Sequence, residues 1–341
     1  MGKYDPIFSK FGEKNILVIG DVILDKYIRG SVSRISPEAP VPVILESESF
    51  HIPGGAANVA HNLCGLGAQV TLVGRIGNDS DGDALRKQLK RKGVNTQAIF
   101  VDKRLPTISK TRVIAQQQQV VRIDREKVGI SGSRETIQRI YNFINKNISR
   151  FDAIIISDYG KGLITSDLVE FVQSKALESK KIILVDPKVE HFGYYRNVTA
   201  ITPNLREAEN AIRNIKITSQ AAGTLAIHSD RLTRDEDIDL AGRELLRYLD
   251  LEALLITLGE RGMRLFERGK KPVSIKTKVR EVYDVSGAGD TVISTFALSL
   301  CCGATKRQAA EIANFAGGIV VGKVGTAVVT KEELLKAIRG H

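Results

Sequence analysis

Short apolar runs alternate with helical patterns along almost the whole chain. Near-continuous apolar runs predict buried strands at 15–20, 69–77, 151–157, 181–186, 198–202 and 253–258. Helical patterns lie at 54–67, 79–92 and 133–149. Strands that are apolar along their whole length are typical of a parallel sheet covered by helices on both faces. We therefore expect a single α/β domain of the ribokinase-like, doubly wound kind over residues 12–339, with no linker dividing it.

Two early segments, 25–48 and 106–126, interrupt the succession of buried strands and helices, because polar and apolar residues alternate along them. The second predicts a β-hairpin that turns near 116–119. The segments could be edge strands of the main sheet, but we favour a small separate sheet that projects from the core as a lid. Because exposed apolar strand edges need covering, the lid also predicts a homodimer.

Composition and charge narrow the class of protein. Of the 341 residues, 43% are hydrophobic and 26% charged, and no run is long and apolar enough to cross a membrane. Cys64, Cys301 and Cys302 match neither a disulfide framework nor metal-ligand spacing, and the N-terminus lacks a signal-peptide pattern, so we expect a cytoplasmic protein. The net charge of +11 is spread along the chain without a nucleic-acid-binding motif. Anionic small substrates, such as nucleotides and sugar phosphates, explain it without nucleic acid.

The segment DVSGAGD, residues 284–290, carries the strongest chemical signal. It follows a strand-like stretch at 279–283 and leads into an apolar helical run. Gly287, Ala288 and Gly289 allow a tight turn, so several backbone N–H groups would converge on an anion at a helix N-terminus. Asp290 beside that anion is explained if its carboxylate takes a proton from a hydroxyl that attacks a phosphoryl group. The alternative is an ordinary acidic residue in the first turn of a helix.

Three separated motifs then agree on a family. GGAANVAHNLCGLG at 54–67, TPNLRE at 202–207 and DVSGAGD resemble the signatures of the ribokinase-like (PfkB) sugar kinases. A closer resemblance, over residues 12–338, is to the D-glycero-β-D-manno-heptose-7-phosphate kinases of lipopolysaccharide-core biosynthesis. Its most specific phrases are GDVILDKYIRGSVSRISPEAPVPV at 20–43 and EVYDVSGAGDTVI at 281–293.

The resemblance implies a reaction and its cofactors. The γ-phosphate of ATP moves to the anomeric hydroxyl of heptose 7-phosphate and gives the 1,7-bisphosphate, with Mg²⁺ as cofactor and activation by a monovalent cation left open. Asp290 would be the general base, and the amides of Gly287, Ala288 and Gly289 would stabilise the transferred phosphoryl group. Many such kinases are fused to a nucleotidyltransferase that this sequence does not show, so we expect a stand-alone kinase. The alternatives are a kinase for another sugar or nucleoside, and a non-catalytic sugar- or nucleotide-binding regulator.

The expected sugar site lies near the end of the first strand, where open α/β sheets bind ligands. Asp21 and Asp25 could accept hydrogen bonds from sugar hydroxyls, although Asp25 could also be a turn or cap residue. Gly54 and Gly55 would let the backbone approach the sugar, and Asn58 would offer its amide. Close helix packing by small residues is the competing explanation for this glycine-rich stretch.

The expected nucleotide site uses the element TPNLRE. Asn204 and Glu207 lie three residues apart at the start of a helix, so both can face one spot, where Glu207 could hold Mg²⁺ through water. A plain helix cap is the structural alternative. By resemblance, Leu205, Arg206 and Gly259 also belong to the nucleotide site.

The 7-phosphate of the expected substrate needs cations. We favour Lys161, because DYGKG places it on a glycine-flanked loop beyond the end of a strand. Other candidates are Arg34, Lys110, Arg112, Arg122 and Lys188.

Overall fold

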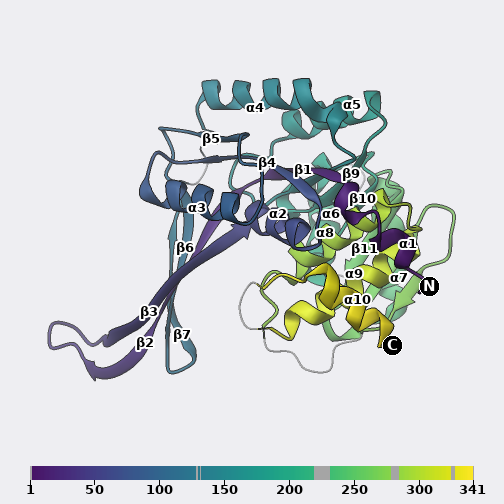
Figure 1. Ribbon diagram of the computed structural model, residues 1–341. Coiled ribbons are helices and arrows are strands. Elements are labelled where there is room, and N and C mark those ends of the chain that lie inside the picture. The colour runs from purple at the N-terminus through teal and green to yellow at the C-terminus, as the bar shows by residue number, and fades with distance from the viewer. Residues whose placement is uncertain are drawn as a thin grey trace.

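A large mixed sheet runs through the middle of the computed structural model, which describes residues 2–127, 130, 132–218, 231–277, 284–323 and 327–340 (Figure 1). Within these residues the sheet has nine strands in the order β13-β12-β11-β10-β9-β8-β1-β4-β5. Their bounds are β1 Asn15–Gly20, β4 Gln69–Ile76, β5 Ile99–Val101, β8 Ala153–Ser157, β9 Ile182–Asp186, β10 Ala200–Ile201, β11 Ala253–Thr257, β12 Met263–Glu267 and β13 Val273–Ile275. All neighbours pair in parallel except β12, which is antiparallel to both of its neighbours.

Helices cover both faces of this sheet, as the apolar strand runs predict. The bounds are α1 Asp5–Phe8, α2 Ala56–Gly65, α3 Ser80–Arg91, α4 Arg134–Asn147, α5 Ser166–Glu178, α6 Leu205–Thr218, α7 Asp235–Tyr248, α8 Ala288–Cys301, α9 Lys306–Val321 and α10 Lys331–Arg339. Short 3-10 helices lie at Phe11–Glu13, Ile148–Arg150, Val189–Tyr194 and Gly259–Arg261. None of the helices in the described ranges is both long and apolar enough to span a bilayer.

The two faces of the sheet bury separate hydrophobic cores. In β1, Ile16 and Val18 point into the core formed with α2, α3, α8 and α9, whereas Leu17 and Ile19 point into the core formed with α4 to α7. Successive side chains of a strand point to opposite faces, so a strand buried on both sides must be apolar at every position. This is the physical reason for the continuous apolar runs in the sequence.

A second sheet projects away from this core (Figure 1). It is formed by β2 Val22–Ile35, β3 Pro42–Gly55, β6 Ile108–Ala115 and β7 Gln118–Arg125, in the order β3-β2-β6-β7. The predicted lid sheet is therefore confirmed. The hairpin turns at Gln116 and Gln117, which both have positive φ. The first two lid strands extend beyond the predicted segment 25–48 at both ends, because β2 follows β1 directly and β3 runs into α2, whereas β6 and β7 lie within the predicted segment 106–126.

The carboxyl ends of the parallel strands meet at one edge of the main sheet, beside the root of the lid. Asp21, Asp158, Thr202 and Leu258 each follow a strand that ends there, and Asp186 is the last residue of β9. Strand β10 is only two residues long, because Pro203 lies close behind it and has no N–H for a ladder. The strand-like stretch predicted at 279–283 lies outside the described residues.

Candidate active site

Asp290 sits in the first turn of α8, as the DVSGAGD motif predicts. Gly287 is the residue before the helix, with φ 79 and ψ 3, a left-handed conformation that favours glycine. The helix begins at Ala288, and the Asp290 side chain is almost fully buried, with 5% of its surface exposed. The turn therefore delivers a carboxylate into the interior at the sheet edge where the strands end.

Two donors from distant segments hold this carboxylate. The Asn58 amide in α2 donates to Oδ2 of Asp290 at 2.7 Å, and the Tyr159 hydroxyl, in the loop after β8, donates to Oδ1 at 2.9 Å. Burial raises the pKa of Asp290 to about 6, although both hydrogen bonds act to lower it. The structure thus brings the GGAANVA and DVSGAGD elements together at one carboxylate that is mostly ionised at neutral pH.

Asp21 anchors the loop that carries Tyr159. Its carboxylate accepts hydrogen bonds from the backbone N–H groups of Tyr159, Lys161 and Leu163 at 3.1, 3.0 and 3.3 Å, and only 1% of the residue is exposed. The side chain does not line the cavity described below. Asp21 therefore has a structural role in this loop, and its predicted contact with a sugar hydroxyl stays a prediction.

Asp25 also has a protein partner. Arg112 in β6 donates to its Oδ1 at 2.6 Å, across the root of the lid. A Cβ atom at Gly54 would lie 2.1 Å from Oδ2 of Asp25, so glycine at this position makes room for that carboxylate. Gly55 has φ 57, a conformation that favours glycine. The two glycines are thus explained by the lid root itself, without a sugar.

A cavity of about 310 Å³ lies in front of Asp290. Of the predicted site residues, it is lined by Lys161, Asn204, Glu207, Gly287, Gly289 and Asp290. The lining also includes Lys110 and Lys188, two further candidates for the 7-phosphate, together with Asp158, Tyr159, Asp186, Pro187, Thr202 and Thr257. Ala288 is not on its wall, and the Ala288 N–H donates to the Val285 carbonyl at 3.3 Å, so the amides of Gly287 and Gly289 are the better candidates for contacting an anion.

Six residues of the cavity lining were not predicted: Asp158, Tyr159, Asp186, Pro187, Thr202 and Thr257. All lie at or just beyond the carboxyl ends of strands, where ligands bind in open α/β sheets. Tyr159 lies in the DYGKG segment that carries Lys161, and Asp186 is the last residue of the predicted strand 181–186, so the ends of the predicted strands could have found both.

Acidic groups gather on one side of the cavity. Asn204 and Glu207 cap α6 reciprocally: the Asn204 N–H donates to Oε2 of Glu207 at 2.8 Å, and the Glu207 N–H donates to Oδ1 of Asn204 at 2.9 Å. Asn204 and Glu207 therefore do form a helix cap, yet both residues also line the cavity. Burial raises the pKa of Asp186 well above its usual range, and the charges of Asp290 and Glu207 raise it further.

Three lysines line the same cavity but differ in their partners. Lys161 forms an ion pair with Glu126 at 2.7 Å, and Lys188 lies 3.6 Å from Glu190. No ion pair or hydrogen bond from the described residues engages the Lys110 side chain, and burial lowers the pKa of Lys110. Lys110 is therefore the cation with the greatest capacity for an added anion, whereas the sequence favours Lys161.

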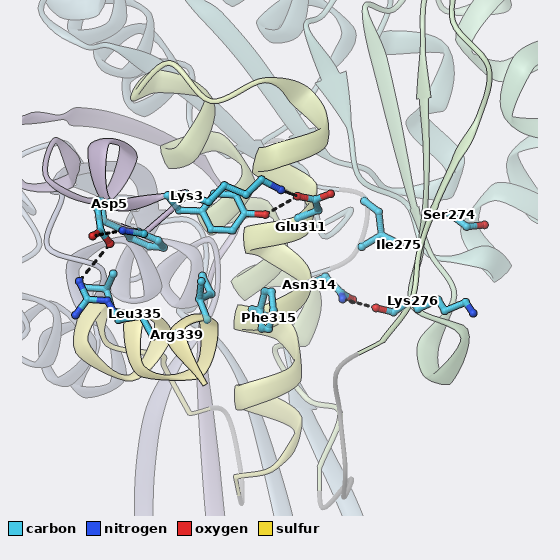
Figure 2. Close-up of a pocket in the computed structure, with 14 residues that line it drawn as sticks. Lys3, Asp5, Ser274, Ile275, Lys276, Glu311, Asn314, Phe315, Leu335 and Arg339 are labelled. Carbon is cyan, nitrogen blue, oxygen red and sulfur yellow. Dashed lines mark hydrogen bonds and ion pairs between the residues drawn. The ribbon is translucent and has the colours of Figure 1, made fainter. Parts of the chain in front are cut away.

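A second cavity, of about 500 Å³, lies between the N-terminal segment, β13, α9 and α10. Figure 2 shows two pairs of charged groups in its lining: Lys3 reaches Glu311 at 3.0 Å and Arg339 reaches Asp5 at 3.2 Å. The Asn314 amide donates to the Lys276 carbonyl at 2.8 Å. None of the predicted site residues lines this cavity.

Solved structures of sugar kinases share the fold. Ribokinase of Arabidopsis thaliana, complexed with ribose and ATP, matches with a TM-score of 0.72 and 17% identity, over 96% of this chain and 99% of that chain. Phosphofructokinase-2 of Escherichia coli, in complex with potassium, matches with a TM-score of 0.76 and 17% identity, over the same shares. The architecture is therefore ribokinase-like.

Curated proteins match this chain with higher sequence identity than these solved structures do. Bifunctional protein HldE of Desulfatibacillum aliphaticivorans is 43% identical over 327 residues, which is 96% of this chain and 63% of that protein. The protein of the same name from Geotalea uraniireducens is 42% identical over 337 residues, which is 99% of this chain and 65% of that protein. The profile described as pfkB family carbohydrate kinase matches residues 13–333. With this match over nearly its whole length, the chain belongs to the pfkB family of carbohydrate kinases.

Proposed function

We propose that this kinase transfers the γ-phosphate of ATP to the anomeric C1 hydroxyl of D-glycero-β-D-manno-heptose 7-phosphate, giving the 1,7-bisphosphate on the route to ADP-heptose and the lipopolysaccharide core. The observation that carries the proposal is the buried Asp290, bonded to Asn58 and facing a cavity lined by three lysines. The substrate is supported by the HldE relatives and by the resemblance of segments 20–43 and 281–293 to heptose-7-phosphate kinases.

Asp290 acts as the general base in this proposal. Its carboxylate accepts the proton of the C1 hydroxyl while the hydroxyl oxygen bonds to the γ-phosphorus, and the bond from that phosphorus to the β–γ bridging oxygen breaks, releasing ADP. Because the pKa of Asp290 is about 6, the carboxylate is mostly ionised at pH 7. The transition state is loose, so correct placement by Asn58 and Tyr159 matters more than base strength.

The amides at the start of α8 complement this base. The N–H groups of Gly287 and Gly289 lie at a helix N-terminus on the cavity wall, where negative charge is favoured. They would stabilise charge that develops on the transferred phosphoryl group.

The donor set also fits the Mg²⁺ that a kinase uses. Asp186 and Glu207 face the cavity, burial raises the pKa of both carboxyl groups, and the hydroxyl oxygen of Thr202 is buried without a hydrogen-bond partner among the described residues. Asp186 and Glu207 would hold the ion, with Glu207 bound through water, since Mg²⁺ keeps several waters and few protein ligands. When bound, the ion supplies positive charge that neutralises the phosphate oxygens.

The sugar phosphate would be held by Lys110 and Lys161. Lys110 lies in the root of the lid, in register with Asp25 of β2, and Lys161 lies on the loop after β8. Lys188 follows β9, and its charge lowers the pKa of Glu207, which supports assigning Lys188 to the nucleotide side of the cavity in this proposal.

A homodimer through the lid completes the proposal. Large apolar side chains are exposed on the lid strands and their connections: Ile35, Val41, Leu45, Val121 and Ile123. A second copy that covers this surface would bury it and would pair exposed strand edges. Sedimentation that shows only monomer at working concentrations would contradict this part of the proposal.

The substrate is tested by steady-state kinetics with ATP, Mg²⁺ and a panel of heptose 7-phosphate, fructose 6-phosphate and ribose. We expect the highest kcat/KM with heptose 7-phosphate and a product phosphorylated at C1. Faster turnover of another sugar would show that this sugar is the substrate, and it would leave the proposed role of Asp290 in phosphoryl transfer unchanged. ATP binding without turnover of any sugar would favour the non-catalytic alternative.

A further inference from the structure

A chain of buried polar side chains links α8 to α2 and returns to Asp290. The Thr291 hydroxyl donates to Oδ1 of Asn62 at 2.8 Å, and Nδ2 of Asn62 donates to Oδ1 of Asn58 at 3.3 Å. Nδ2 of Asn58 then donates to Oδ2 of Asp290 at 2.7 Å. The exposed fraction is 0% for Asn62 and Thr291 and 1% for Asn58. Buried polar groups of this kind are costly unless each has a partner.

The directions of these hydrogen bonds follow from chemistry. Asn62 also faces the backbone carbonyl of Asn58, at 3.0 Å, and a carbonyl oxygen can only accept. The end of Asn62 that faces Asn58 must therefore be its NH₂ group. Because the same NH₂ group meets the side chain of Asn58, the facing end of that amide must be the oxygen. The opposite end of Asn58 is then its NH₂ group, which points at Asp290.

We propose that Asn62 is a positioning residue for the phosphoryl transfer, because it fixes the amide of Asn58 in the orientation that donates to the catalytic carboxylate. The inference rests on the proposed function, in which Asp290 is the base. Asn62 does not line the cavity and acts only through Asn58. With the amide of Asn58 reversed, two oxygens would face each other at the position where a 2.7 Å hydrogen bond now forms.

Residue spacing explains why one helix can hold both amides. Asn58 and Asn62 are four residues apart in α2, so they lie one above the other on the face that packs against α8. Thr291 lies next to Asp290 in α8, so the polar chain begins and ends in the same helical turn. It couples the orientation of the base to the packing of the two helices.

The same helix interface offers a matched control. Ser294 is also fully buried in α8, and its hydroxyl contacts the backbone carbonyls of Val59 at 3.1 Å and Asp290 at 2.6 Å. It bridges the same two helices without contacting the amide of Asn58 or Asn62. A purely structural role for Asn62 predicts the same behaviour for Asn62→Leu and Ser294→Ala.

The experiment compares these variants in full-length protein by steady-state kinetics and thermal unfolding. We expect both to lower Tm, but only Asn62→Leu to lower kcat, by about tenfold, with the KM values for ATP and sugar phosphate within about twofold of wild type. In an Asn58→Leu background, Asn62→Leu should have no further effect on kcat, because both substitutions act on the same interaction, the hydrogen bond from Asn58 to Asp290.

The results that overturn the inference are equally specific. A folded Asn62→Leu protein with the kcat of Ser294→Ala, or effects of Asn58→Leu and Asn62→Leu that multiply, would show that Asn62 does not act through Asn58. If Asn62→Leu does not fold, Thr291→Val removes the hydroxyl that donates to Asn62 at 2.8 Å and also lies 3.2 Å from the Gly287 carbonyl, and it should lower kcat by about threefold. An unchanged kcat there would also reject the inference. A wild-type protein that phosphorylates no sugar refutes the proposed function instead.

Discussion

The cavity beside Asp290 and the cavity between the N-terminal segment, α9 and α10 contrast in size and in charge. The one between the N-terminal segment, α9 and α10 is the larger, about 500 Å³ against about 310 Å³. Four of its five charged side chains form two pairs, Lys3 with Glu311 and Arg339 with Asp5. In the smaller cavity, no ion pair from the described residues engages Asp186 or Lys110.

Under the proposed function, the volume of a cavity is a poor guide to the position of the active site in this protein. Paired charges stabilise a surface cleft modestly and leave little capacity for a ligand. Buried acids and bases without partners cost free energy, so a protein keeps them where a ligand completes them. Changes in the two cavities should therefore have opposite consequences, for turnover in one and for stability in the other.

The largest effect is expected from Asp290→Asn. The variant removes the group that accepts the proton, so kcat should fall by about a thousandfold while ATP still binds. Glu311→Gln is the matched control, because it neutralises a carboxylate in the other cavity. The measurements are steady-state rates and ATP titration of both variants. A kcat for Asp290→Asn within tenfold of wild type would show that Asp290 is not the general base.

The next largest effect concerns the cavity lysines. Lys110→Met removes the lysine that no described partner neutralises, so the KM for the sugar phosphate should rise about tenfold or more. Lys161→Met should also raise the KM for the sugar phosphate, but less strongly, because the ion pair with Glu126 already partly neutralises the charge of Lys161. Each KM is measured with sugar phosphate and with unphosphorylated sugar. Equal losses for both substrates would show that these lysines do not recognise the phosphate.

A smaller effect is expected on the pH dependence. Asp290 must be ionised to accept a proton, so kcat/KM should fall as the pH drops through about 6. Tyr159→Phe removes a donor that lowers the pKa of Asp290, so the acidic limb of its pH profile should move to higher pH. Comparing the two proteins with the same substrates cancels the titration of the substrates themselves. Coincident acidic limbs would mean that another group titrates there.

Local patterns predict the elements of this fold well but not the partners of its side chains. The apolar run at 15–20 coincides with β1, and the alternating segments do form the lid. The resemblance brought Asn58 and Asp290 into one site, although they are 232 residues apart in sequence. The bond from Tyr159 to Asp290 and the ion pair of Lys161 with Glu126 were not predicted. Both depend on how loops after different strands pack, which no short-range periodicity encodes.

The smallest effect is expected from the paired cavity. Glu311 accepts hydrogen bonds from Lys3, Tyr4 and Arg307, so it ties the N-terminal segment to α9. Lys3 and Arg307 are largely exposed, and exposed ion pairs contribute little, so Glu311→Gln should lower the free energy of unfolding by about 1 kcal/mol or less and leave kcat unchanged. Denaturant unfolding and steady-state rates measure the two quantities. A fall in kcat with unchanged stability would contradict the contrast between the cavities, because it would link the larger one to catalysis.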